Sequence, residues 1–158
     1  MEKTETEKII ERIKTLEDAM EATGMTLPPE EQLACLPKDV VAFMKLRIIA
    51  AALNGLKAET LHEFPTFDEM ECRYFPWFKI YSESESRNKT SKEESLLVWG
   101  ACAFPGSHAG LVCLFSYTAW TSTWSTFAAR LAVNSDKIAI YFGRQFIGIW
   151  KDYIFCQD

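Results

Sequence analysis

Apolar residues recur every three or four positions near the start of the chain: Ile9, Ile13, Leu16 and Met20. This period predicts an amphipathic helix over residues 6–22. Thr4 and Glu7 form a capping-box pattern at its start, and Gly24 is a natural stop. We therefore expect one N-terminal helix with a narrow apolar stripe, typical of a helix that packs on a single partner.

Two further helices are predicted by their apolar pattern. Residues 38–53 follow Pro37 and are apolar on nearly every side, which indicates a central buried helix ended by Asn54 and Gly55. Residues 136–155 begin at a capping sequence, Asn134-Ser135-Asp136, and carry their large apolar residues on one side. Gly143 and Gly148 lie inside this last helix and each costs about 1 kcal/mol against Ala, so we expect close packing on a neighbouring sheet to explain them.

Strand-forming residues gather in the second half of the chain, at residues 73–81, 96–104, 110–115 and 127–133. Pro76 lacks a backbone N–H and so restricts the first of these segments to an edge strand or a bulge. The helices and strands together predict an α+β fold. It has two N-terminal helices, a small antiparallel β-sheet of three to five strands and a long C-terminal helix packed on the sheet.

Charge divides the chain into two predicted parts. The formal net charge is −5 for 158 residues, and it lies wholly in residues 1–39. We expect residues 1–26 to form an acidic N-terminal helix, as an appendage or for oligomerisation into a homo-oligomer, and residues 27–158 to form a single α+β domain. The acidic balance disfavours nucleic acid as a partner, although residues 73–79 mix basic and aromatic side chains.

The chain has no motif that points to catalysis. It lacks a P-loop, a dinucleotide fingerprint and a nucleophile elbow. Cys102, His108 and Cys113 have the residue types of a metal site or of a thiol–imidazole pair, but their spacing fits no common zinc arrangement. We expect reduced cysteines, no metal, no cofactor and no enzymatic activity.

Residues 95–129 contain no Asp, Glu, Lys or Arg, in a chain that is 25% charged. Within them, residues 116–126 are almost wholly Ser, Thr, Tyr and Trp, a composition typical of adaptable binding surfaces. The alternative is an ordinary hairpin, because Thr, Tyr and Trp also favour strands. The predicted ligand-binding residues are Phe104, His108, Tyr117, Trp120, Thr121, Ser122 and Trp124.

Five sets of residues in the chain resemble stretches of a known group of proteins. They are Lys38 to Leu46 with Ala52 to Gly55, Tyr74 to Phe78, Gly106 to Leu111, Ala129 to Ala132, and Tyr141 to Phe146 with Trp150 to Asp152. They are similar to small proteins encoded by phages, prophages and mobile elements of gut Bacteroidales. The segment over 116–126 also resembles the variable region of C-type-lectin-like proteins diversified by retroelements.

These observations predict a non-enzymatic phage or mobile-element accessory protein that presents a Ser/Thr/Tyr/Trp-rich surface to a protein or glycan ligand. Two alternatives are a structural virion component assembled through the N-terminal helix, and an anti-defence protein that sequesters a nucleotide signal or a host protein. No apolar run long enough for a membrane span and no signal peptide occur in the sequence. We expect a soluble protein in the host cytoplasm or associated with the virion, with no membrane partner.

Overall fold

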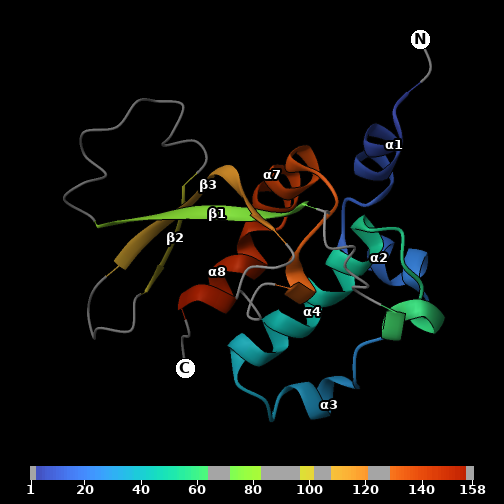
Figure 1. Ribbon diagram of the computed structural model, residues 1–158. Coiled ribbons are helices and arrows are strands. Elements are labelled where there is room, and N and C mark those ends of the chain that lie inside the picture. Colours follow the sequence, from blue (N-terminus) through green and yellow to red (C-terminus); the bar gives the residue numbers. More distant parts are fainter. Residues whose placement is uncertain (1–2, 64–71, 83–96, 102–107, 121–128, 156–158) are drawn as a thin grey trace.

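The structure is a computed structural model that describes residues 3–63, 72–82, 97–101, 108–120 and 129–155. It has the expected α+β class, with an antiparallel sheet covered by helices (Figure 1). In chain order the helices are α1 (Glu5–Arg12), α2 (Leu16–Thr23), α3 (Glu30–Leu33), α4 (Lys38–Leu53), α7 (Asp136–Gln145) and α8 (Ile147–Phe155), with short 3-10 helices η1 (Ala58–Glu63) and η2 (Ala129–Leu131).

The described part of the sheet has three strands: β1 (Cys72–Ser82), β2 (Val98–Ala101) and β3 (His108–Trp120). Their order is β1-β3-β2, so β3 is central and β1 is an edge strand. Every pair is antiparallel. The prediction of an edge strand for the segment around Pro76 is confirmed, because β1 lies at the edge of the described sheet. The register also shifts between Trp77 and Phe78, but the extra residue lies on β3.

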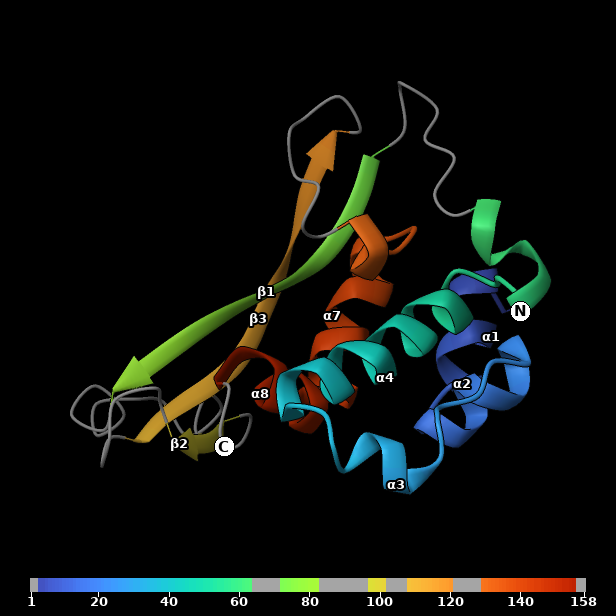
Figure 2. The ribbon, with the colours of Figure 1, turned by 90° about the horizontal axis from the view of Figure 1, so that it is seen from below.

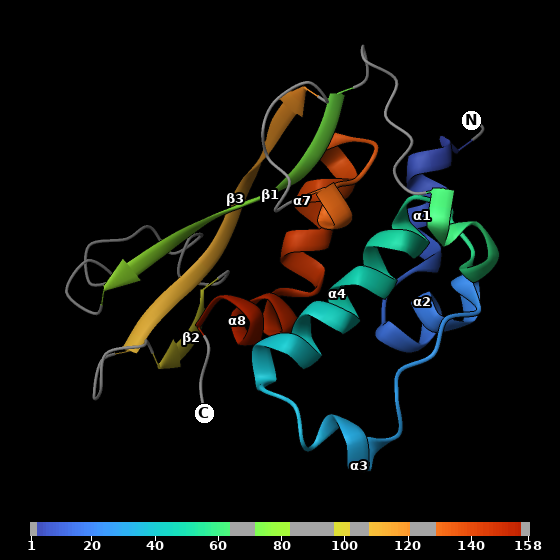
Figure 3. The same ribbon diagram turned by 60° about the horizontal axis from the view of Figure 1, so that its bottom comes forward.

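The helices lie on one side of the sheet (Figure 2). α7 packs against β1 and β3, α8 packs against β2 and β3, and α4 packs on α8. The N-terminal α2 packs in turn on α4, and α1 packs on α7, so the two N-terminal helices lie on different helices of the main layer (Figure 3). The largest fully buried side chains lie between these elements and include Phe142, Leu46, Ile49, Leu53 and Leu111.

The predicted helix over residues 38–53 is confirmed, and so are both of its ends. α4 follows Pro37 and is capped by Asn54, and Gly55 takes the left-handed conformation at φ 71°. The Asn54 Nδ2 atom donates to the Ala50 carbonyl at 2.8 Å and to the Ala132 carbonyl at 2.9 Å. This side chain therefore ends the helix and also joins it to the chain that follows η2.

The first predicted helix is two helices, and the single span over 6–22 is wrong. The capping box at Thr4 and the left-handed stop at Gly24 are confirmed, but the chain is extended at Ile13 and a second capping box begins at Thr15. Ile13 has no exposed surface and belongs to the core. The apolar stripe of this segment therefore packs within the chain itself.

The C-terminal helix is also divided. α7 is capped at Ser135 as predicted and ends at Gln145, and α8 follows after Phe146. The break lets each half pack on a different surface, α7 on the long strands and α8 on α4 and β2.

The predicted strand over 127–133 is wrong for its described residues. Ala129–Leu131 form η2, and Val133 makes one isolated bridge with Tyr74 of β1, through N–O distances of 3.0 and 2.7 Å. Pro76 lies two residues after Tyr74 on the same edge of β1, and it has no N–H that could extend the pairing. The bridge therefore cannot extend into a strand.

Candidate functional site

The predicted binding residues fall mainly at the ends of the described segments. Phe104, Thr121, Ser122 and Trp124 lie outside the described residues. His108, Tyr117 and Trp120 lie on β3, where the structure describes their main chain. The first part of the predicted binding segment is therefore strand, since β3 runs through to Trp120.

Strand pairing places this part of β3 beside an aromatic run on β1. Tyr117 lies opposite Phe75 in the register, and Phe115 lies opposite Trp77. The neighbourhood of the predicted site thus includes two aromatic positions on β1 that come from a different part of the sequence.

The two faces of β1 are distinguished by what they touch. Tyr74 and Phe78 pack against the core, and Pro76 lies against Gly143 of α7. Because successive strand residues point to opposite faces, Trp77 lies on the face turned away from the helices. This face, which we call the outer face, carries no described helix (Figure 3).

The outer face presents two large aromatic side chains to solvent. Trp77 is 45% exposed and Phe115 is 48% exposed. Their ring centroids lie 6.2 Å apart with an angle of 18° between the ring planes, which is a nearly parallel arrangement. We call these two residues the Trp77–Phe115 pair.

Further along the same two strands, side chains are buried instead of exposed. Val112 has no exposed surface and Tyr81 is 6% exposed. The Lys79 ammonium lies 4.6 Å from the centre of the Tyr81 ring, in a cation–π contact. The open aromatic surface is therefore local and centres on the Trp77–Phe115 pair.

A bulge in β3 sets the position of Phe115. Phe115 pairs with Trp77 and Cys113 pairs with Phe78, which leaves Leu114 as the extra residue. The Arg144 side chain of α7 donates to the carbonyls of Cys113 at 3.1 Å and Leu114 at 3.2 Å. A helix side chain therefore binds the bulge carbonyls and holds the strand where Phe115 turns to the outer face.

Comparison with protein-family models, with curated proteins and with solved structures finds no match to this chain.

The titration of Cys113 bears on the chemistry of this sheet. Burial raises the pKa of its thiol to about 11, even though the positive charge of Arg144 acts in the opposite direction. A thiol with this pKa is protonated at neutral pH and is a poor nucleophile. Cys113 therefore contributes packing to the sheet.

Neither a metal-binding cluster nor a membrane-spanning helix occurs among the described residues. Within the described ranges, no three His, Cys, Asp or Glu side chains gather closely enough to hold a metal ion. Among the same residues, no helix combines the length and apolar character that a membrane crossing requires.

The Trp77–Phe115 pair was missed by sequence reasoning, which weighed residues 73–79 as a mixture of basic and aromatic side chains suited to nucleic acid. Strand alternation was a partial signal in the sequence, because it places Trp77 and Pro76 on opposite faces. Pro76 is buried against α7, and strict alternation then turns the next residue away from the helices. The sequence alone does not show which side of Pro76 the helices cover.

Proposed function

We propose that this chain is a non-enzymatic binding protein of a phage or mobile element, and that it binds a glycan through the Trp77–Phe115 pair. One observation carries the proposal: two large aromatic rings lie nearly parallel and half exposed on a sheet face without a described helix. Exposed aromatic surface of this kind is costly to leave in water, and a ligand that covers it gains hydrophobic free energy.

The shape and chemistry of the pair favour a sugar ring. The two half-exposed rings offer apolar surface that can contact the C–H face of a pyranose, whose hydroxyls lie around its edge. Residues 116–126, which continue from Phe115, supply Ser, Thr and Tyr hydroxyls in the sequence. Neutral hydroxyls of this kind are suited to hydrogen bonding with sugar hydroxyls.

A protein ligand is less well supported by the described surface. A stable protein interface covers roughly 800 Å² on each partner. Among the described residues, the exposed large aromatic side chains are Trp77 and Phe115, and Val112 and Tyr81 are buried further along the same strands. Nucleic acid is disfavoured by the net charge of −5.

The test is a glycan array probed with the full chain and with Trp77→Ala and Phe115→Ala. We expect the wild-type chain to bind a defined set of glycans, and each variant to lose at least about tenfold in affinity, as central aromatic contacts do. Ile80→Ala is the matched control, because Ile80 is 51% exposed on the same strand and lies outside the pair. The proposal would be overturned if the wild-type chain bound no glycan, or if Trp77→Ala and Phe115→Ala bound glycans as tightly as Ile80→Ala.

A stability measurement separates loss of binding from loss of fold. Trp77→Ala should lower the free energy of unfolding by no more than about 2 kcal/mol, because nearly half of the side chain is already in water. Phe142→Ala, at a fully buried ring, should cost about 3–5 kcal/mol in the same denaturant titration. A comparable cost for both variants would make Trp77 a core residue.

A further inference from the structure

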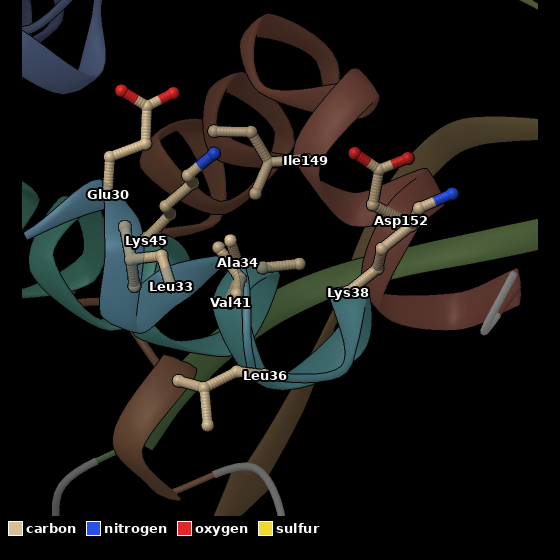
Figure 4. A pocket seen from close by; sticks show the side chains of 10 residues that line it. Glu30, Leu33, Ala34, Leu36, Lys38, Val41, Lys45, Ile149 and Asp152 are labelled. Atoms are coloured by element: carbon tan, nitrogen blue, oxygen red, sulfur yellow. The ribbon is translucent and has the colours of Figure 1, made fainter. Parts of the chain in front are cut away.

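A pocket of about 450 Å³ lies between α3, α4 and α8, away from the sheet (Figure 4). Its volume falls in the range of small-molecule sites. Leu33 of α3, Val41 of α4 and Ile149 of α8 supply an apolar lining from three different helices. The pocket is therefore suited to the apolar body of a ligand.

Two lysines of α4 flank this apolar lining. Lys38, Val41 and Lys45 follow one another at helical spacing on one side of α4. The two lysines are seven positions apart, which is about 10 Å along a helix axis. Figure 4 shows the Lys45 side chain directed into the pocket, toward Ile149.

The Lys45 ammonium has no ion-pair partner within the described part of the chain. It is half-buried, and no hydrogen bond or ion pair joins it to another described residue. Placing a charge beside apolar surface is unfavourable unless the charge is paired. An anionic group bound in the pocket would supply the missing partner.

The pocket also contains two carboxylates, and they limit what it can bind. Glu30 and Asp152 lie on opposite sides of the apolar lining, and Asp152 has a neighbour in Lys151 at 3.7 Å. With two acids and two lysines the lining has no net charge, so a highly charged anion such as a phosphate gains little. A single carboxylate on an apolar body can approach Lys45 between the two acids.

We infer that the pocket between α3, α4 and α8 binds a small monocarboxylate with an apolar chain or ring, and that Lys45 pairs with its carboxylate. The apolar body lies against Leu33, Val41 and Ile149. This site lies on different elements from the Trp77–Phe115 pair and does not depend on glycan binding.

Isothermal titration of the full chain with octanoate tests the assignment, with octanol as the uncharged comparison. We expect octanoate to bind more tightly than octanol. Lys45→Met keeps the apolar stem and removes the charge, and it should weaken octanoate binding about tenfold, the range for one charged hydrogen bond. Lys57→Met, at an exposed lysine outside the pocket, is the control and should leave binding unchanged.

A second pair of variants tests the location independently of charge. Ala34→Trp, at the exposed residue that caps the C-terminus of α3, fills the pocket from its rim and should abolish octanoate binding. Gln32→Trp places the same side chain on α3 outside the lining and should leave binding intact. The assignment would be overturned if the folded wild-type chain did not bind octanoate. It would also be overturned if the Lys45→Met and Ala34→Trp variants bound octanoate as tightly as the wild-type chain.

Discussion

At the scale of single residues, Gly143 is where the helix and the sheet meet most closely. A Cβ at this position would lie 2.7 Å from Pro76 Cβ and 3.0 Å from Cys113 Cβ, and closer still to the Cys113 Sγ atom. The missing side chain lets α7 approach both β1 and the bulge of β3. The sequence-based expectation of close packing is confirmed here and is wrong for Gly148, which has nothing within 4 Å of a built Cβ.

Substitution of these two glycines should therefore have opposite effects. Gly143→Ala should lower the free energy of unfolding by about 1–3 kcal/mol, because the added methyl group overpacks the contact between α7 and the sheet. Gly148→Ala should raise it by about 0.5–1 kcal/mol through helix propensity. Urea titration of both variants measures the two changes, and a neutral Gly143→Ala would show that the layers are not in close contact.

Cys113 makes a second residue-scale prediction, about pH. Its thiol pKa is raised from 9.0 to about 11 by burial, so the folded state holds the proton more tightly than the unfolded state. The stabilisation is complete below about pH 9 and is lost as the pH rises through 11. Melting temperatures measured from pH 8 to pH 11 should fall less steeply for Cys113→Ala than for the wild-type chain. If the melting temperatures of the two proteins fell in parallel with pH, the raised pKa of Cys113 would be contradicted.

At the scale of elements, the boundaries that depend on local chemistry could be predicted from the sequence. The capping residues Thr4 and Ser135 and the stop at Gly24 act on the few residues beside them, and all three are confirmed. The extent of α4 is confirmed for the same reason, since Pro37 and Asn54 fix its ends.

Breaks imposed by distant contacts could not be predicted in this way. The chain between α1 and α2 is extended, and two side chains of α7 bind its carbonyls. Tyr141 donates to the Ile13 carbonyl at 2.6 Å, and Gln145 donates to the Lys14 carbonyl at 2.9 Å. These partners satisfy backbone groups that a continuous helix would have bonded internally. One local signal was missed, because Thr15 and Asp18 repeat the capping box of Thr4 and Glu7.

The packing of the N-terminal helices gives a prediction at this scale. Ile13→Ala should lower the free energy of unfolding by about 2–5 kcal/mol, because Ile13 is fully buried in the core. Ile10→Ala is the matched control, since Ile10 is half-buried and lies outside the core cluster, and its cost should be clearly smaller. Chemical denaturation of both variants makes the comparison. Equal small costs would show that α1 and α2 are an appendage.

At the scale of the whole molecule, the helices cover one face of the sheet and leave the aromatic pair on the other. The α+β class follows from the order of helical and strand patterns in the sequence. Which aromatic residues face solvent depends on the register of β1 and β3, and a one-residue bulge at Leu114 changes it. Local patterns do not contain that register, and Trp77 and Phe115 are 38 positions apart in the chain.

The most direct test of the proposed binding site is a map of backbone amide shifts in a nitrogen-15 NMR titration with the best glycan from the array. We predict that the largest shifts fall on β1 around residues 75–79 and on β3 around residues 112–118, on both sides of the Trp77–Phe115 pair. The pocket between α3, α4 and α8 should remain unshifted. Shifts confined to that pocket, or none on either strand at saturation, would contradict glycan binding through the outer face of the sheet.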